Sequence, residues 1–381
     1  MSDFIVSARK YRPVRFADMV GQEHISSTLK NALKSGKIAH SFLFCGPRGV
    51  GKTTAARILA RTLNCEQLSA DFESCGTCGS CQAFAENNSF NIYELDAASN
   101  NSVDDIRALV EQVRYTPQAG KYKIYIIDEV HMLSASAFNA FLKTLEEPPS
   151  YCKFILATTE KHKILPTILS RCQIFDFRRM KVDHIIGHLR NIAAAEGVTA
   201  DDEALLIIAQ KADGGMRDAL SMFDRLVSFC TGHLTYERVL ENLNVLDFDY
   251  YFKVTDALLT EDVSAALVLF NDILRKGFEG DDFLIGLSEH FRNLLFCKDP
   301  ATLQLMEVSE NLRVRYQTQT AQTSADFLLN CLQLCNQADV QYRASKNKKL
   351  LVELCLMKMA LVSRMTEVVD VEKKKSLTAG S

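Results

Sequence analysis

The run GPRGVGKTT, from Gly46 to Thr54, carries the strongest chemical signal in the sequence. It matches G-x-x-x-x-G-K-[ST], a pattern in which glycines allow successive backbone N–H groups to turn inward around a polyphosphate. Lys52 is expected to reach the β- and γ-phosphates, and the Thr53 hydroxyl to bind a magnesium ion that keeps most of its waters. The alternative, a Gly-rich turn without a ligand, is disfavoured because a strand pattern precedes the run and a helix pattern follows it. The predicted nucleotide-binding residues of this loop are Gly46, Pro47, Arg48, Gly49, Val50, Gly51, Lys52, Thr53 and Thr54.

Two adjacent carboxylates, Asp128 and Glu129, follow the apolar run KIYIID, which predicts a strand over Lys123–Asp128. Open α/β sheets bind their ligands at the carboxyl ends of the strands. Asp128 would hold the magnesium ion through water, and Glu129 would polarise the water that attacks the γ-phosphate. The alternative is a pair of solvated carboxylates at a strand end, and the phosphate loop upstream argues against it.

Four cysteines, Cys65, Cys75, Cys78 and Cys81, have the spacing C-x9-C-x2-C-x2-C. Such close spacing predicts one tetrahedral zinc ion. A disulfide pair is disfavoured by a reducing compartment, and an iron–sulfur cluster by the absence of a redox partner domain in the sequence. Because a closed shell of four thiolates leaves no position for substrate, we expect a structural metal that stabilises the chain and leaves nucleotide affinity nearly unchanged.

The whole-chain composition fits an intracellular protein of two or three domains, with 381 residues, a formal net charge of −3 and 12 cysteines. The charge gives no general bias toward nucleic acid, so such binding would need a local basic patch. The sequence has no run typical of a signal peptide or a membrane span. Cysteines inside apolar helical patterns suggest a reducing compartment, and we expect a soluble, cytoplasmic protein without membrane contact.

Alternating strand and helix patterns surround the phosphate loop and end at about Phe177. The predicted strands are Phe42–Phe44, Ile92–Leu95, Lys123–Asp128 and Phe154–Thr159. Helices are predicted over Gly21–Lys34, closed by Gly36, and over Val103–Val113, capped by Ser102. The pattern indicates an α/β domain with a parallel sheet.

The remaining pattern is helical, and no further strand is predicted. Three helices, Val182–Ala195, Glu203–Ala212 and Met216–Phe229, indicate a small helical domain, and amphipathic stretches continue from about Phe248. The predicted divisions are an α/β core over 1–178 with an insert at about 64–85, a three-helix domain over 179–243, an all-helical domain over 244–368 and a flexible tail over 369–381.

Two pairs with i, i+4 spacing resemble ligand pairs. Cys331 and Cys335 lie on an apolar helix face, which favours buried thiols over metal ligands. His184 and His188 have no acidic third ligand beside them, so we expect a solvated helix face.

The order of these motifs resembles the tau/gamma family of clamp-loader subunits of the bacterial replicative polymerase. The resemblance covers nearly the whole chain and is carried by ARKYRPVRFADMVGQEH, GPRGVGKTT, the cysteine insert, DEVHML, KTLEEPP, SRC and GGMRDALS. It implies an AAA+ ATPase core, with the three-helix domain as its lid and the last helical domain as an oligomerisation collar.

The resemblance also implies roles for single residues. Thr159 would be the polar sensor that positions the attacking water, and Arg217 the lid sensor that reaches the nucleotide in cis. Arg171, within SRC, would be an arginine finger that enters the site of a neighbouring subunit, where charge spreading over the γ-phosphoryl oxygens needs a further cation. The residues expected to line the adenine pocket are Ala8, Tyr11, Pro13 and Val20.

The partners implied by the resemblance are other clamp-loader subunits in a ring-like hetero-pentamer, the sliding clamp and primer-template DNA. A C-terminal extension would add contacts with polymerase and helicase. Asn100 and Ser102 stand where the family's DNA channel has cations, which leaves Arg107 and Lys143 as candidates for phosphate contacts. Both residues are equally well explained as ordinary surface charges, and helix N-termini can contact phosphates instead.

Three functions are weighed. The resemblance favours an ATP-driven, DNA-dependent motor of DNA replication that opens a ring-shaped clamp and loads it. The run DEVH resembles a DExH box, but a single core without a second RecA-like domain argues against a helicase. A catalytically silent scaffold of the same fold is opposed by the intact Lys52, Thr53 and paired carboxylates.

Overall fold

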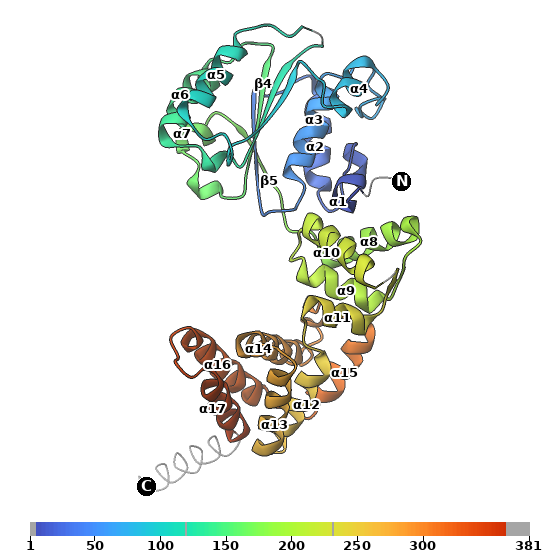
Figure 1. The fold of residues 1–381 in the computed structure, drawn as a ribbon, viewed down its shortest axis with the longest axis vertical. Helices are drawn as coiled ribbons and strands as arrows, with labels where there is room; N and C mark the ends of the chain where they lie inside the picture. Colours follow the sequence, from blue (N-terminus) through green and yellow to red (C-terminus); the bar gives the residue numbers. More distant parts are fainter. Residues whose placement is uncertain (1–4, 119, 231, 363–381) are drawn as a thin grey trace. The chain divides into compact units, whose positions relative to one another are not determined.

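The computed structural model describes residues 5–118, 120–230 and 232–362, which form two compact units (Figure 1). The first unit ends at Leu234 and contains both the α/β core and the three-helix segment; the second begins at Thr235. The predicted tail over 369–381 lies outside the described residues.

A sheet of five parallel strands forms the centre of the first unit in the described part of the chain, in the order β2-β3-β4-β1-β5. The strands are β1 (Ser41–Cys45), β2 (Ile92–Asp96), β3 (Lys123–Asp128), β4 (Cys152–Thr158) and β5 (Gln173–Asp176). Since all neighbouring strands are parallel, their carboxyl ends meet at one edge of the sheet. The predicted α/β class with a parallel sheet is confirmed.

The fifth strand was not predicted from the sequence. β5 has one buried residue, Phe175, and three exposed ones, because it pairs only with β1 and lies at the edge of the sheet. The other four strands were predicted from continuous apolar runs. A strand with only one buried residue has no such run, so this signal is missing from β5.

Helices cover both faces of the sheet, as Figure 1 shows. One face packs against α2 (Glu23–Ser35) and α3 (Lys52–Leu63), and contributes Phe42 and Phe44 from β1 to that core. The other face packs against helices on the opposite side and contributes Leu43 and Cys45. Those helices are α5 (Val103–Val113), α6 (Ala135–Glu146) and α7 (Pro166–Leu169). Burial on both faces explains why the central strands are continuous apolar runs.

The predicted helix over Val103–Val113 and its cap are both confirmed. The Ser102 hydroxyl accepts a hydrogen bond from the Asp105 N–H at 3.2 Å, and the Asp105 carboxylate accepts one from the Ser102 N–H at 3.3 Å. This capping box satisfies N–H groups that the first helical turn leaves without partners.

The three predicted helices of the following segment are confirmed within one residue at each end: α8 (Val182–Glu196), α9 (Asp202–Lys211) and α10 (Met216–Phe229). Two strands of two residues each, β6 (Thr199–Ala200) and β7 (His233–Leu234), pair in parallel beside them and were not predicted. The short helix α1 (Ser7–Lys10) is tied to α10, since the Ser7 N–H donates to the Asp224 carboxylate at 2.6 Å.

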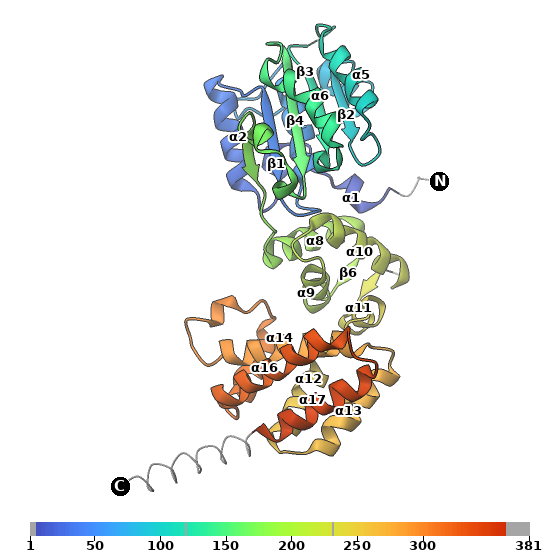
Figure 2. The same ribbon diagram turned by 90° about the vertical axis from the view of Figure 1, so that its left-hand side faces the viewer.

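The described part of the second unit is helical (Figure 2). Its helices are α11 (Tyr236–Leu243), α12 (Phe248–Leu259), α13 (Val263–Arg275), α14 (Gly280–Phe296), α15 (Glu310–Thr320), α16 (Ala325–Tyr342) and α17 (Lys348–Ala360). Helices α13, α14, α16 and α17 pack side by side around one apolar core. Cys331 and Cys335 are fully buried in that core, which confirms the prediction of buried thiols.

Among the helices in the described part of the chain, none combines the length and the apolar character needed to cross a membrane.

A buried polar network lies inside the second unit. His290 on α14 is 1% exposed; its Nδ1 lies 3.2 Å from the Tyr316 hydroxyl and its Nε2 lies 2.9 Å from Gln319 Oε1. The Gln319 amide donates in turn to the Phe252 carbonyl at 2.9 Å and to the Asp256 carboxylate at 2.6 Å. Burial lowers the pKa of His290 to about 4. The second unit therefore holds this imidazole in its neutral form.

We expect acid to weaken the second unit through His290. The folded-state pKa lies below the ordinary value, so the neutral ring contributes stability above pH 6.5, and that stability is lost as pH falls toward 4. The full difference corresponds to about 3 kcal/mol. Hydrogen exchange in α14 and α15 at pH 7.5 and pH 4.5 measures the change. The His290→Gln variant should lose less protection between the two pH values than the wild type, whereas a control at an exposed ring, His162→Gln, should match the wild type. Equal losses in all three proteins would contradict the prediction.

Candidate functional site

A cavity of about 790 Å³ lies in the first unit, over the loop between β1 and α3. Its walls come from the N-terminal arm before α2, the loop itself, the carboxyl ends of β2 and β3, and the helices α8 and α10. The volume is in the range of small-molecule sites. All four arm residues predicted for the adenine pocket line it, together with the predicted Arg217: Ala8, Tyr11, Pro13 and Val20.

The glycines of the loop adopt backbone conformations that a side chain would hinder. Gly46, Gly49 and Gly51 have φ angles of +147°, +77° and +100°. A Cβ atom on Gly46 would lie 2.5 Å from the Phe177 carbonyl oxygen, and one on Gly49 would lie 3.2 Å from the Gly215 Cα atom. The loop is therefore held between the chain after β5 and the start of α10, where only glycine fits.

Lys52 and Thr53 both line the cavity. Lys52 is buried, and its ammonium donates to the Gly46 carbonyl at 2.8 Å and to the Pro47 carbonyl at 2.7 Å. Burial lowers the pKa of Lys52, and the Asp128 and Glu129 carboxylates oppose that effect. The Thr53 hydroxyl donates to Asp128 Oδ2 at 2.6 Å. A hydroxyl and a carboxylate side by side are hard oxygen ligands, so this pair fits a magnesium ion.

Glu129 lies beside Thr159 at the carboxyl ends of β3 and β4. Its Oε2 accepts hydrogen bonds from the Thr159 hydroxyl at 2.9 Å and from the Thr159 N–H at 3.3 Å. Glu129 has a φ of +47°, an uncommon conformation for a residue with a side chain and one that recurs at functional sites. The two predicted catalytic residues are thus brought together, and Glu129 is turned toward the cavity that it lines.

His131 is a residue of this site that the sequence analysis missed. Its side chain is buried; Nδ1 lies 3.0 Å from the Thr158 hydroxyl and 3.4 Å from Glu129 Oε2, and Nε2 lies 3.6 Å from Glu160 Oε2. The signal was present in the run DEVHML, which the sequence analysis used for the family resemblance and weighed as a helicase box without giving the histidine a role. The ring connects the carboxylate of Glu129 to the segment that follows β4.

Two further residues of the cavity wall were also missed. Arg12 lines the cavity, and burial lowers the pKa of its guanidinium. His188 lines it as well, and burial lowers the pKa of its ring. His184 is exposed, as predicted. The expectation of a solvated face is wrong for His188, because this residue of α8 lines the cavity together with Met180.

Arg171 lies away from the cavity formed by its own chain. It follows α7, and its side chain is one-third exposed. Its Nη2 donates to Glu146 Oε1 at 2.7 Å, and its Nη1 donates to the Thr167 carbonyl at 2.5 Å. Arg171 is therefore held at the surface of the first unit.

The two predicted DNA-contacting residues are exposed on neighbouring helices, Arg107 on α5 and Lys143 on α6. Arg107 lies 3.4 Å from the Asp104 carboxylate. Ser102 caps α5, and the Asn100 amide donates to the Asp96 carbonyl at 3.0 Å, so both polar residues have local structural partners.

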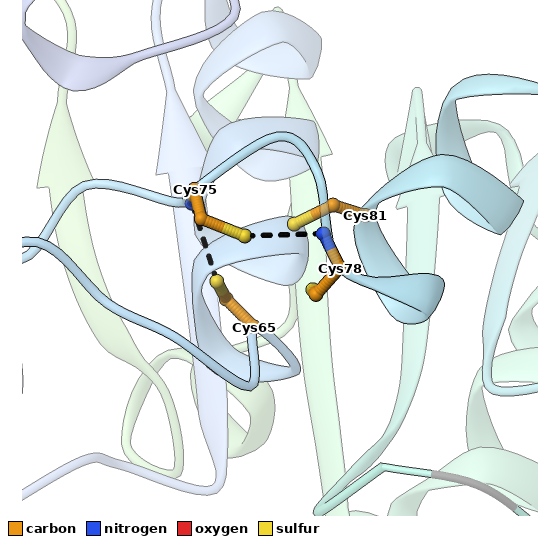
Figure 3. Close-up of side chains that lie close together, drawn as sticks. All are labelled: Cys65, Cys75, Cys78 and Cys81. Atoms are coloured by element: carbon orange, nitrogen blue, oxygen red, sulfur yellow. Dashed lines mark hydrogen bonds between the residues drawn. The ribbon is translucent and has the colours of Figure 1, made fainter.

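The four predicted zinc ligands are brought together, with their sulfur atoms within 4.8 Å of one another (Figure 3). The Cys75 N–H points at the Cys65 sulfur at 3.3 Å, and the Cys78 N–H points at the Cys75 sulfur at 3.3 Å. Backbone N–H groups of Thr77 and Cys78 lower the pKa of Cys75 to about 6, which favours a thiolate. Four converging sulfurs, one of them readily ionised, fit a zinc ion.

The close approach of Gly46 to Phe177 gives a test of the loop. Gly46→Ala should lower nucleotide affinity by about tenfold or more, because the loop must move by about an ångström to relieve the contact. The matched control is Gly36→Ala, at a φ of +69° with no atom within 4 Å of the added Cβ, which has backbone strain but no clash. Titration with a fluorescent ATP analogue measures both variants. Wild-type affinity in Gly46→Ala would contradict the importance of this contact.

Three family models match successive parts of the chain. They are described as DNA polymerase III, delta subunit, over residues 21–181; DNA polymerase III clamp loader subunit, ATPase lid domain, over residues 184–232; and DNA polymerase III subunits gamma and tau domain III, over residues 234–373. Together they follow the order of elements described above.

Two solved structures have low similarity to the chain. The Thermotoga maritima RuvB Holliday junction branch migration motor is 20% identical, with a TM-score of 0.47 over 65% of this chain and 79% of that one. The Bacillus subtilis DNA clamp loader delta protein is 17% identical, with a TM-score of 0.38 over 88% of this chain and 99% of that one. Because both TM-scores are below 0.5, we assign the family from the family models and the curated relatives alone.

Curated relatives match most of the chain. DNA polymerase III subunit tau of Bacillus subtilis is 41% identical over 94% of this chain and 63% of its own length, and that of Escherichia coli is 40% identical over 81% and 48%. The chain thus spans about half to two thirds of the length of these relatives. DNA polymerase III subunit gamma of Buchnera aphidicola is 34% identical over 94% of this chain and 97% of its own length. The chain therefore belongs to the gamma/tau family of DNA polymerase III subunits.

Proposed function

We propose that this chain is an ATPase subunit that drives the loading of a ring-shaped sliding clamp onto primed DNA during replication. The observation that carries the proposal is that Lys52, the Thr53–Asp128 pair and Glu129 line one cavity, which Arg217 also lines, while Thr159 holds the Glu129 carboxylate. These are the parts that phosphoryl transfer to water requires. The family-model name "clamp loader subunit" supports the clamp as the object on which the ATPase acts.

In the proposed mechanism the loop binds the phosphates of ATP through its backbone N–H groups, as helix N-termini do. Lys52 exchanges its bonds to the Gly46 and Pro47 carbonyls for the β- and γ-phosphates. Thr53 and Asp128 would hold Mg²⁺, which neutralises charge on the phosphate oxygens. Glu129 polarises the attacking water, and Thr159 both orients that carboxylate and positions the water.

Arg217 is proposed to contact the nucleotide from the lid. Its backbone N–H donates to the Gly49 carbonyl at 3.3 Å, and its side chain lines the cavity. Because α10 thereby contacts both the loop and the cavity, a change of nucleotide can alter how the lid packs on the core. Such coupling lets hydrolysis change the shape of an assembly.

Arg171 is proposed to act in trans as an arginine finger. Its guanidinium lies at the surface, outside the cavity of its own chain, and its partner Glu146 is itself exposed. An exposed bond of this kind contributes little, so the arginine can leave Glu146 for a neighbouring nucleotide at small cost.

Zinc at Cys65, Cys75, Cys78 and Cys81 is proposed to be structural, since four thiolates would fill its coordination shell.

The domain boundaries predicted at 178 and 243 remain our proposal for core, lid and collar. The family models that begin at 184 and at 234 support a similar division.

The proposed partners are other clamp-loader subunits in a ring-like hetero-pentamer, the sliding clamp and primer-template DNA, in the cytoplasm. Arg107 and Lys143 are proposed to contact DNA phosphates, supported by their exposure on adjacent helices. Polymerase and helicase are proposed as further partners that would be contacted through a C-terminal extension. A helicase of the DExH type is less well supported, because the described residues contain a single large parallel sheet.

Glu129→Gln tests the mechanism and excludes a silent scaffold. The variant should bind ATP and assemble normally but lose about 100-fold or more in turnover, since the phosphate-binding groups are intact while the water loses its carboxylate. Steady-state ATPase measured on the assembled complex with DNA and clamp gives the result. The control Glu86→Gln, an exposed glutamate outside the cavity, should behave as wild type. Wild-type turnover in Glu129→Gln would remove this residue from the mechanism.

Arg171→Ala tests the finger. The isolated variant should keep its ATP affinity within about threefold, yet lose about 1,000-fold in hydrolysis stimulated by DNA and clamp, the usual scale for arginine fingers. Arg190→Ala is the matched control, because Arg190 is also an exposed arginine paired with a carboxylate, that of Asp202 at 2.8 Å. It should retain stimulated hydrolysis.

Mixed assemblies distinguish action in trans from action in cis. When Arg171→Ala chains are combined with Lys52→Ala chains, some interfaces pair an intact Arg171 with an intact loop, so part of the activity should return. A mixture that co-assembles and stays as inactive as either parent would show that Arg171 acts within its own subunit.

A further inference from the structure

Glu73 connects the cysteine insert to the N-terminal arm. It lies between Cys65 and Cys75 and is 8% exposed. Its Oε2 accepts the Phe16 N–H at 2.8 Å, and its Oε1 accepts the Ala17 N–H at 3.0 Å. Both backbone donors are more than 50 residues away in the chain, at separations of 57 and 56. The carboxylate therefore joins two segments that the sequence separates.

The bonded N–H groups begin a short 3₁₀ helix, Phe16–Asp18, in the middle of the arm. First-turn N–H groups of a helix have no partner inside it, and a carboxylate at that end satisfies them and interacts favourably with the helix dipole. The Phe16 side chain is 1% exposed in the core beside α2 and α3. The short helix is thus held in two ways: its backbone N–H groups bond to Glu73, and its Phe16 side chain packs in the core.

The same short helix lies between the arm residues that form the cavity wall. Pro13 precedes it, Met19 and Val20 follow it, and all three line the cavity. The position of the 3₁₀ helix therefore sets the position of the wall on both of its sides. Lys30 of α2 completes the contact, with its ammonium 2.6 Å from Glu73 Oε1.

The position of Glu73 depends on the turn that carries it and on the cysteines beside it. The Glu73 N–H donates to the Ser69 hydroxyl at 3.0 Å, and the Ser69 N–H donates to the Glu73 carbonyl at 3.0 Å. Two residues after Glu73, the Cys75 N–H points at the Cys65 sulfur, which closes the loop that begins at Cys65. A metal that ties Cys65 to Cys75 would keep this loop, and with it Glu73, in place.

We propose that Glu73 is a positioning residue through which the zinc insert holds the adenine side of the nucleotide cavity, so that zinc occupancy raises nucleotide affinity. The inference rests on the proposed nucleotide-binding function. It replaces the expectation, drawn from the sequence, that the metal stabilises the chain without affecting nucleotide affinity. The hydrogen bonds from the arm to Glu73 connect the insert to the cavity wall, and the spacing of the cysteines gave no sign of them.

The test uses the full chain loaded with zinc and the variant Glu73→Gln, which keeps the shape of the side chain and removes its charge. Loss of one charge-assisted hydrogen bond corresponds to about a tenfold change in an equilibrium constant, so the Kd for a fluorescent ATP analogue should rise about tenfold. Amide exchange at Phe16 and Ala17 should become faster, while zinc content stays that of the wild type. The control Glu66→Gln lies in the same loop, is exposed and makes the same change of charge. It should match the wild type in both measurements.

Removal of zinc with a chelator gives the second arm of the experiment. In the wild type it should weaken nucleotide binding about tenfold and speed exchange at Phe16 and Ala17. In Glu73→Gln it should add less than about twofold, because two changes that act through one contact are not additive. Unchanged affinity and exchange in Glu73→Gln, or equal effects of chelation on both proteins, would overturn the inference while the proposed function stands. Absence of ATP binding in the zinc-loaded wild type would overturn both.

Discussion

Parallel pairing of β1 with both β4 and β5 is the constraint on which the candidate site depends. The register aligns Cys45 with Thr158 on one side and with Asp176 on the other, so all three strands end at the same level. The chain then continues each ladder by one further bond: the Gly46 N–H donates to the Thr158 carbonyl at 3.2 Å, and the Phe177 N–H donates to the Cys45 carbonyl at 2.7 Å. The phosphate loop therefore starts in a backbone frame that is already hydrogen-bonded on both sides.

The tight packing of that frame explains the glycines at the loop. The carbonyl of Phe177 occupies the space where a Gly46 side chain would begin, and Gly215 of the lid approaches Gly49. The core and the lid thus meet at the loop mainly through backbone atoms of Gly49 and Gly215, with the Asp218 carboxylate beside them. Because the lid and the loop pack this closely, a displacement of the loop on phosphate binding would also move the lid.

Sequence reasoning succeeded where one segment carries its own signal. The apolar runs of β1, β3 and β4 follow from burial on both faces, and the cysteine spacing identified four sulfurs that the structure does bring together. It failed where a residue acquires its role from distant segments. β5 is an edge strand with one buried residue, and Arg12 and His188 reach the cavity only because the arm and α8 pack around the loop. Glu73 likewise has no local pattern, since its partners are 57 and 56 residues away.

The cysteine insert illustrates how the structural metal site that we propose can become part of a functional site. Its helix α4 (Gly79–Ala85) has two buried residues, Cys81 and Phe84, which is too few for a core of its own. The insert instead uses α3, the helix that the phosphate loop begins: Arg57 of α3 lies over the Phe84 ring at 4.7 Å from its centroid. Glu73 of the insert also accepts hydrogen bonds from the arm. The proposed metal shell, although closed to substrate, would not isolate the insert, because the polypeptide that supplies the thiolates also contacts α3 and, through Glu73, the arm that lines the cavity. Whatever orders the four sulfurs would therefore also order, through Glu73, part of the wall of the cavity in which we propose that the nucleotide binds.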